Sequence, residues 1–333
     1  MLALGLSMLW EQSVDPEAAL RERFGFAGLD AVEAWVSLAL ARTWEITVDS
    51  CSRVVISDHN AIVWVHGDQG TLVVKWSRAR ERFSNLEASA RLLRTVAEHG
   101  IPVAAPIATV DGLDRVSLDG PVGPLSVTVL PELPGEWLDV SDDTSVRSAG
   151  AGLAEVHRVF RSVPNDDLPS LASPKALPER ISQWLTGWDR GFAPAASQRV
   201  RDRLASLPSL EDPVQLVHND FRAANVLTRN SRVVAVLDFD DVVFDHRVND
   251  LAKATVYLGT RFTDWRPTPA AAQLMFHAGY ESVQPLSPTE REWLELLVLW
   301  HGIMAIPGRD DTAGWASAAT GDHEHQVDPP LER

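Results

Sequence analysis

A polar loop at residues 218–225 has apolar residues on both sides, and a further apolar run at residues 233–237 follows it. Each apolar segment is short enough for a β-strand. The loop contains Asp220 and, five positions later, Asn225, and Asp238 directly follows the last run. Phosphoryl transfer from a magnesium nucleotide needs a carboxylate that accepts a hydroxyl proton, and an amide and a second carboxylate that bind the metal. The pattern therefore predicts Asp220 as the catalytic residue and Asn225 and Asp238 as metal ligands.

The spacing His-x-Asp-x-x-x-x-Asn, followed by a strand that ends in Asp-Phe-x, resembles the catalytic and metal-binding segments of the protein-kinase-like superfamily. The resemblance is closest to its small-molecule branch, the aminoglycoside phosphotransferase and choline kinase-like enzymes, and covers residues 44–252. It implies an α+β, bilobal fold with a small β-rich N-terminal lobe and a larger, mainly helical C-terminal lobe. It also implies Mg²⁺ with ATP or GTP, and Asp240 as a secondary metal contact. The alternative is a surface turn before a strand capped by acids.

The length of 333 residues exceeds one usual hydrophobic core and favours two lobes. We place a nucleotide-binding lobe at residues 1–130, a catalytic and substrate-binding lobe at 131–306 and a polar tail at 307–333. The net charge of −16 disfavours nucleic acid and anionic membranes, and favours a cationic partner. A single cysteine excludes an internal disulfide and suits a reducing cytoplasm. The apolar residues 1–10 are too short for a membrane span and poorly formed for a signal peptide. Nothing in the sequence indicates an obligate protein partner.

Alternating apolar positions predict three strands in the first lobe, at residues 44–57, 61–66 and 71–76. Lys75 lies in the third strand, where the resemblance places the lysine that binds the nucleotide phosphates. A buried ammonium group needs a partner. The resemblance assigns that role to Glu87, near the start of an amphipathic helix at residues 84–93. The alternative for Glu87 is an ordinary solvated helix acid.

Further nucleotide contacts are implied by the resemblance at a turn and at a hinge. The turn after the first strand contains no glycine, unlike the phosphate loop of protein kinases, which leaves Ser57 and Asn60 as candidates. A plain β-turn is an equal alternative for this pair. Pro131, Glu132 and Leu133 resemble the hinge that binds adenine through backbone groups. Because proline has no N–H, Leu133 is the favoured donor.

The second lobe is predicted to be helical at residues 141–159, 178–189, 195–207, 269–280 and 287–303. The resemblance assigns the second and third of these segments to the acceptor pocket. The resemblance implies a histidine beneath the catalytic loop at His157, for which a structural role is favoured over a catalytic one. It also implies that Asp250, in an Asp-Leu-Ala helix start, anchors that loop. His323 and His325 have acidic neighbours that offer a metal site, but a disordered tail is the favoured interpretation.

Arg222 follows Asp220 by two positions, and we predict that it stabilises charge on the moving phosphate, with a surface salt bridge as the equal alternative. Residues 245–333 contain thirteen Asp or Glu against seven Lys or Arg. This excess favours a cationic aminoglycoside or amino sugar as acceptor, and with it an antibiotic-resistance role. A macrolide, homoserine or a choline-type alcohol are the alternatives. The rival activities are a protein kinase, which the missing glycine loop disfavours, and a catalytically dead nucleotide-binding module, which would need no proton acceptor.

Overall fold

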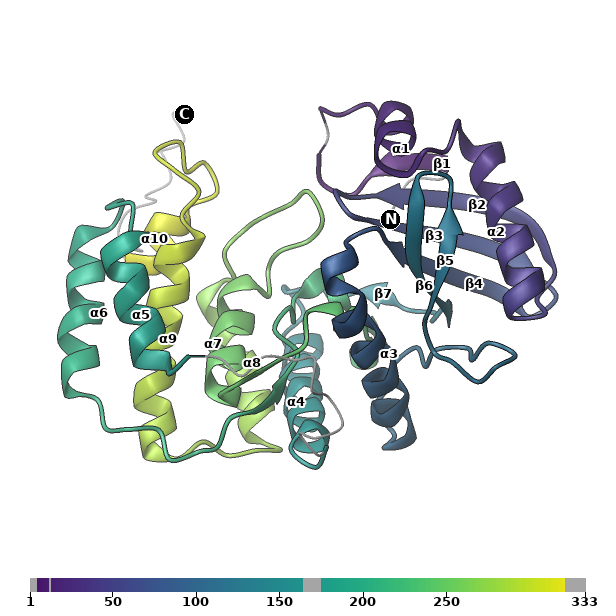
Figure 1. Ribbon diagram of the computed structural model, residues 1–333. Coiled ribbons are helices and arrows are strands. Elements are labelled where there is room, and N and C mark those ends of the chain that lie inside the picture. Colours follow the sequence, from purple (N-terminus) through teal and green to yellow (C-terminus); the bar gives the residue numbers. More distant parts are fainter. Residues whose placement is uncertain (1–4, 12, 164–174, 321–333) are drawn as a thin grey trace, which may run out of the picture. The chain divides into compact units, whose positions relative to one another are not determined.

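The computed structural model describes residues 5–11, 13–163 and 175–320, and its contacts divide the chain into two compact units (Figure 1). The sheet unit comprises Met1–Leu138, Arg158–Ala172 and Ala224–Val242. The helical unit comprises Asp139–His157, Ser173–Ala223 and Val243–Arg333. Each unit is made of several separate stretches of the chain. From the sequence, each lobe is instead expected to be one continuous stretch. Strands gather in the first unit and helices in the second, so the fold is α+β, as the resemblance implies.

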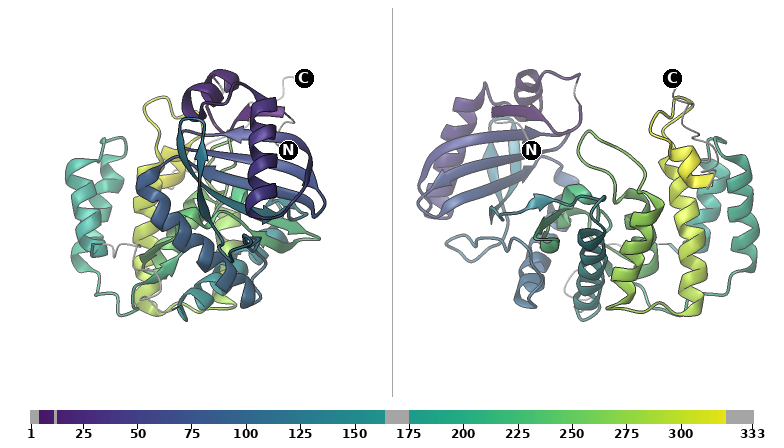
Figure 2. Two further views of the ribbon diagram at one scale, coloured as in Figure 1. Left: turned by 45° about the vertical axis from the view of Figure 1, so that its right-hand side comes forward. Right: turned by 180° about the vertical axis from the view of Figure 1, so that it is seen from behind.

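A six-stranded sheet forms the centre of the sheet unit, in the order β1-β2-β3-β4-β6-β5. Its strands lie side by side in the views of Figure 2, and every neighbouring pair is antiparallel except β1 and β2. The strands are β1 (Gly5–Met8), β2 (Val48–Ile56), β3 (Asn60–Gly67), β4 (Gly70–Ser77), β5 (Val116–Gly120) and β6 (Gly123–Pro131). In β4, Leu72, Val74 and Trp76 are buried in the core of this unit. Because side chains alternate along a strand, Lys75 lies on the opposite face.

Two helices pack on that core, α1 (Pro16–Phe24) and α2 (Leu29–Thr43). Asp15 caps α1 by accepting a hydrogen bond from the Ala18 N–H at 3.2 Å, and Gly25 ends it at φ +78°. Phe24 meets Trp76 of β4 edge to face, with ring centroids 6.2 Å apart. Among the described residues, no single helix is long and apolar enough to cross a membrane, and α1 and α2 reach that character only as a pair bent by 45°.

A second, three-stranded sheet in the same unit positions the two predicted metal ligands, Asn225 and Asp238. Its order is β10-β9-β7, with β7 (Glu136–Trp137), β9 (Val226–Arg229) and β10 (Arg232–Val236). The β9–β10 turn contains Asn230 and Ser231, both at positive φ, which suits a tight hairpin. The hairpin register pairs Val226 with Val236, one residue beyond Asn225 on one strand and two before Asp238 on the other. The unit also contains η1 (Arg80–Arg82), α3 (Phe83–Glu98) and η4 (Phe239–Asp241). The last two residues of η3 (Ala223–Asn225) belong to it as well.

The helical unit consists of helices around a two-stranded pair, β8 (Gln215–Val217) with β11 (Val243–Asp245). The helices are α4 (Asp143–Phe160, as far as His157), α5 (Leu177–Gly187), α6 (Pro194–Ser206), α7 (Arg247–Tyr257), α8 (Ala270–Glu281), α9 (Pro288–Ala305) and α10 (Trp315–Thr320). Ser287 and Glu290 form a capping box at the start of α9, the helix that the sequence predicts at residues 287–303.

Helix α10 lies within the region expected to be a polar tail. Trp315 at its start is buried and packs on Tyr257 of α7, with ring centroids 5.7 Å apart. This contact between residues far apart in sequence ties the start of α10 to α7. His323 and His325 lie outside the described residues.

Candidate active site

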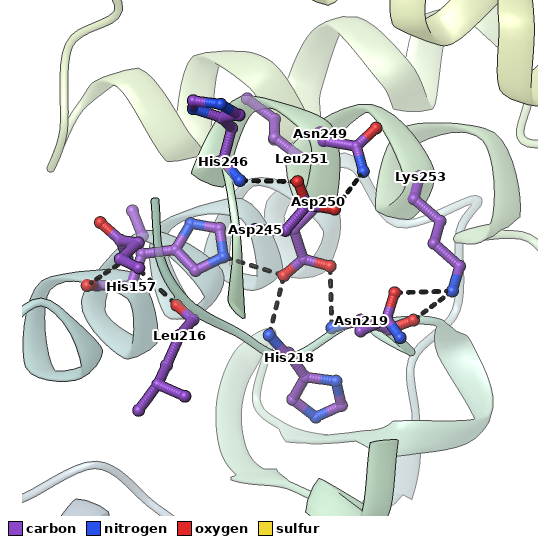
Figure 3. Close-up of polar contacts among 12 residues, drawn as sticks. His157, Leu216, His218, Asn219, Asp245, His246, Asn249, Asp250, Leu251 and Lys253 are labelled. Carbon is purple, nitrogen blue, oxygen red and sulfur yellow. Dashed lines mark hydrogen bonds and ion pairs between the residues drawn. The ribbon is translucent and has the colours of Figure 1, made fainter. Parts of the chain in front are cut away.

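One buried carboxylate, Asp250, holds the loop that carries Asp220. Asp250 lies in the first turn of α7 and is 2% exposed. It accepts hydrogen bonds from the backbone N–H of His218 at 3.0 Å and of Asn219 at 2.9 Å (Figure 3). Burial by itself would raise the pKa of Asp250, but its hydrogen bond to His157 helps to hold that pKa below its usual value. The ionised carboxylate therefore fixes the two backbone groups that precede Asp220, in the anchoring position that the sequence predicts.

His157 is a fully buried residue of α4 that joins three elements beneath this loop. Its Nε2 lies 2.9 Å from Asp250, and its Nδ1 lies 2.8 Å from the Tyr280 hydroxyl of α8. Its backbone carbonyl accepts a hydrogen bond from Gln215 of β8 at 2.9 Å. Both ring nitrogens are engaged by buried groups, which is the arrangement of a structural histidine.

Asp220 itself is partly open, with 27% of its side chain exposed. Arg222 turns toward it, with Nε 3.1 Å from Oδ1 and 3.2 Å from Oδ2. The Arg222 guanidinium also lies over the ring of Trp265, 5.7 Å from its centroid, and Trp265 is 48% exposed. Arg222 is therefore placed to orient the Asp220 carboxylate, whose catalytic role stays a prediction. The contact of Arg222 with the transferred phosphate also stays a prediction.

In the sheet unit, the two predicted metal ligands come together through the backbone. The N–H of Leu237 donates to the carbonyl of Asn225 at 2.8 Å, and Asp238 is the next residue. Asp238 has φ +63°, an uncommon value for a residue with a side chain, of the kind that is concentrated at functional sites. Amide and carboxylate oxygens are the donors that Mg²⁺ prefers.

The oxygen donors of Asn225 and Asp238 suit Mg²⁺ better than a metal ion whose ligands all come from the protein. Among the described residues, no group of three His, Cys, Asp or Glu side chains is placed to hold a metal ion. Mg²⁺ keeps water and substrate phosphates among its six ligands, so it needs few protein donors. Asn225, Asp238 and Asp240 offer oxygen donors of this kind, and their role as metal ligands stays a prediction.

Lys75 contacts both carboxylates of the segment that is predicted to bind the metal. Its Nζ lies 2.7 Å from Asp238 Oδ1 and 2.9 Å from Asp240 Oδ2. Burial would lower the pKa of Lys75, but Asp238 and then Asp240 raise it above its usual value. Burial would likewise raise the pKa of Asp240, but Lys75 and then Arg115 lower it to about 2. Lys75 and Asp240 are therefore both charged at neutral pH.

The sequence profile of the phosphotransferase enzyme family matches residues 54–286, which include all of the groups described above. The chain belongs to this family. Its members transfer a phosphoryl group to a hydroxyl acceptor, and its solved relatives have the protein-kinase-like fold.

Individual relatives of the phosphotransferase enzyme family agree with this assignment. Homoserine kinase from Caulobacter vibrioides (strain NA1000 / CB15N) is 26% identical over 266 residues, 79% of this chain and 81% of that protein. The solved structure of a microcompartment-associated aminopropanol kinase matches with a TM-score of 0.63 and 19% identity, over 86% of this chain and 94% of that one. An amicoumacin kinase in complex with AMP-PNP and Ca²⁺ matches with a TM-score of 0.55 and 17% identity, over 87% and 91% of the two chains.

Within this family member, Lys75 does not pair with Glu87, which corrects the expectation from the sequence. Glu87 forms an ion pair with Arg91 one turn later in α3, and 55% of its side chain is exposed. Leu86 and Ala90 of the same helix are buried, so the rotation of α3 about its axis directs Glu87 into solvent. In the part of the chain that the structure describes, Asp238 and Asp240 take the place of the glutamate as partners of Lys75.

The turn and the hinge segment for which the sequence predicts nucleotide contacts both lie within the described residues. Ser57 and Asn60 close the β2–β3 turn, with the Ser57 N–H donating to the Asn60 carbonyl at 2.9 Å. At the hinge, the N–H of Glu132 already donates to the carbonyl of Thr71 at 3.1 Å. Pro131 has no N–H, and no hydrogen bond of the Leu133 N–H occurs within the described residues. Leu133 stays the predicted adenine donor, and contacts of Ser57 and Asn60 with the nucleotide stay predictions.

Sequence reasoning missed two cations beside the metal-binding segment of the phosphotransferase. Arg82, just before α3, donates to the Asp240 carbonyl at 2.9 Å and pairs with Asp241 at 2.5 Å. Arg115, just before β5, has Nη1 3.7 Å from Asp240 Oδ1. The sequence offers little indication of these contacts. Arg82 and Arg115 reach Asp240 only through the strand register and the path of the chain after β10.

Proposed function

We propose that this phosphotransferase transfers the terminal phosphate of a nucleoside triphosphate to the hydroxyl group of a small amine-bearing alcohol. The observation that carries the proposal is the contact of the Lys75 ammonium group with Asp238. Asp238 directly follows Leu237, whose backbone N–H donates a hydrogen bond to the Asn225 carbonyl. This arrangement combines a buried cation suited to phosphate with two oxygen donors suited to Mg²⁺.

In the proposed mechanism, the acceptor hydroxyl oxygen attacks the terminal phosphorus and its proton passes to Asp220. The bond from this phosphorus to the bridging oxygen breaks, and the nucleoside diphosphate leaves. Arg222 orients the Asp220 carboxylate, and Asp250 holds the backbone before it. Lys75 binds phosphate oxygens, and Asn225 and Asp238 would hold Mg²⁺, with Asp240 as a further contact. When bound, this ion neutralises charge on the phosphate oxygens.

An amine-bearing acceptor is supported by the relatives rather than by the charge of the chain. Homoserine kinases are among the curated relatives, at 26% identity, and the aminopropanol kinase shares the fold. Both names describe a hydroxyl a few bonds from an amine. The acidic excess in residues 245–333 is weaker support than the sequence indicates, because Arg180, which comes from outside this stretch, pairs with Asp245.

A larger, ring-containing acceptor such as an aminoglycoside is the second candidate. Trp265 favours it, because this half-exposed ring lies beside Arg222, which contacts Asp220. Tryptophan faces commonly pack on sugars and other extended rings.

The test is a phosphorylation assay with ATP and GTP in the presence of Mg²⁺. The acceptors are homoserine, aminopropanol, choline, an aminoglycoside and a macrolide, and Asp220→Asn serves as the matched inactive enzyme. We expect turnover with an amino alcohol that the variant lacks. Turnover with the aminoglycoside alone would select the second candidate, and turnover with the macrolide alone would contradict an amine-bearing acceptor.

A further inference from the structure

A second buried cation shares a row of the large sheet with Lys75. Lys75 of β4 pairs with Thr128 of β6, and Val116 of β5 pairs with Val127. One step further in this antiparallel register, Arg115 lies across from Thr128. Residues directly opposite one another in neighbouring strands direct their side chains to the same face. Lys75 and Arg115 therefore occupy the same face of the sheet.

The Arg115 guanidinium is fixed by the neighbouring strand. Only 3% of its side chain is exposed. Its Nε donates to the Ser126 hydroxyl at 2.7 Å and its Nη2 to the Ser126 carbonyl at 3.2 Å. The remaining nitrogen, Nη1, makes no hydrogen bond within the described residues, and lies 3.7 Å from Asp240 Oδ1, which is too long for one. One nitrogen thus faces the carboxylate that Lys75 also contacts, with capacity to donate.

A purely structural link between β5 and β6 would not require a charged group here. Burying a guanidinium is unfavourable unless its charge and its donors are satisfied. The local charges are three cations, Lys75, Arg82 and Arg115, beside three carboxylates, Asp238, Asp240 and Asp241. When the first two carboxylates bind a metal ion, the two buried cations need another anion. The polyphosphate of a nucleotide supplies that charge.

We propose that Arg115 is a second phosphate-binding cation, which acts with Lys75 on the polyphosphate of a nucleoside triphosphate. Ser126 is its positioning residue, because it holds two of the three guanidinium nitrogens. This inference rests on the proposed nucleotide-dependent function. It adds a residue that neither the catalytic-loop motif nor the strand lysine indicates.

Equilibrium binding without turnover tests the role of Arg115. Dissociation constants are measured for a non-hydrolysable ATP analogue with Mg²⁺ and for adenosine, which lacks phosphate. The proteins are wild type, Arg115→Met, Ser126→Ala and, as the matched control, Ser117→Ala, whose exposed serine pairs with Ser126 in the same strand pair. Thermal melting checks that each variant is folded.

For Arg115→Met we expect the Kd of the ATP analogue to rise on the order of tenfold or more, the scale of one hydrogen bond to a charged group. The Kd of adenosine should not change, and the dependence of triphosphate binding on ionic strength should weaken. Ser126→Ala should raise the triphosphate Kd several-fold, and Ser117→Ala should leave it unchanged.

A folded Arg115→Met protein with wild-type affinity for the ATP analogue would overturn the inference and leave Arg115 as a structural link. If this variant does not fold, Ser126→Ala decides, and an unchanged triphosphate Kd in that variant overturns the inference equally. Wild-type protein that binds no nucleotide would instead overturn the proposed function, and this inference with it.

Discussion

The ammonium group of Lys253 donates to both oxygens of Asn219, to the backbone carbonyl at 2.5 Å and to Oδ1 at 2.9 Å (Figure 3). Asn219 directly precedes Asp220 and has φ +65°, in the left-handed region that is unfavourable for residues with a side chain. One turn earlier on α7, Asp250 accepts from the N–H of the same residue. Helix α7 therefore holds Asn219 at both its N–H and its carbonyl group, and so sets the direction in which the chain enters Asp220.

Lys253→Met should lower kcat roughly tenfold. The left-handed conformation of Asn219 costs about 1–2 kcal/mol, and the variant removes the hydrogen bonds from Lys253 that stabilise it. Nucleotide affinity should be unchanged, since Lys75 and Asp238 are not altered. A second substitution, Asn219→Gly, should restore part of the loss, because glycine adopts positive φ without steric strain. Steady-state kinetics and nucleotide titration make the comparison.

The control for this pair is Lys175→Met, which removes an exposed lysine that binds Glu179 at 3.1 Å. Wild-type kcat in Lys253→Met, or no recovery in the double variant, would argue against conformational support of Asn219.

Asp220→Asn should lower kcat by roughly two to four orders of magnitude, the usual range for a positioned general base. The nucleotide Kd should stay within about twofold of wild type, because the amide has the shape of the carboxylate and only the proton acceptor is lost. Asp202→Asn on the exposed side of α6 is the control. Loss of nucleotide binding in Asp220→Asn would instead indicate a structural role.

Asp238→Ala should abolish turnover at every magnesium concentration, because it removes a direct ligand of the ion. Asp240→Ala should raise the magnesium concentration needed for half-maximal rate but retain turnover at saturation. Magnesium titrations of both variants give the comparison. Equal and complete loss in the two would show that both carboxylates bind the ion directly.

Glu87→Gln should leave the nucleotide Kd unchanged, because Glu87 pairs with Arg91 at the surface and not with Lys75. Lys75→Met should raise that Kd on the order of tenfold or more, through loss of a buried phosphate-binding cation. The two variants are compared by nucleotide titration. A large effect of Glu87→Gln would show that α3 turns this side chain inward when nucleotide binds.

His301 in α9 should make the protein sensitive to acid. Burial lowers the pKa of His301 to about 3, and its Nε2 lies 2.9 Å from Asn249 Oδ1. In the unfolded chain the pKa of histidine is about 6.5. Between these values the unfolded state binds a proton that the folded state does not, so the free energy of unfolding falls as the pH drops below about 6.5 toward 3.

His301→Gln keeps a donor for Asn249 but cannot be protonated, so it should flatten this part of the pH profile. Urea unfolding at pH 7.5 and pH 5 measures the difference, with the exposed His99→Gln as control. An unchanged pH dependence in His301→Gln would assign the acid sensitivity to other groups.

Local chemistry accounts for the features that could be read from the sequence. The cap of α1 at Asp15 and the capping box of α9 each depend on residues only a few positions apart. Their hydrogen bonds follow from backbone geometry that a short segment defines by itself.

The partners of Lys75 could not be read in this way. The sequence offers Glu87 as well as Asp238 and Asp240, and the choice depends on how α3 is rotated about its axis and on where the chain turns after β10. The burial of Leu86 and Ala90 decides that rotation, and no residue near Glu87 reveals it.

The sequence by itself determined which residue types stand at which spacing, and so predicted a proton acceptor, an amide and a carboxylate for a metal ion, and a lysine in a strand. Tertiary structure alone decided which charges meet. Arg115 reaches Asp240, and Lys253 reaches Asn219, because strand register and helix packing bring them together. Electrostatic interactions depend on distance in space, and a linear sequence fixes such distances only where the residues are neighbours along the chain.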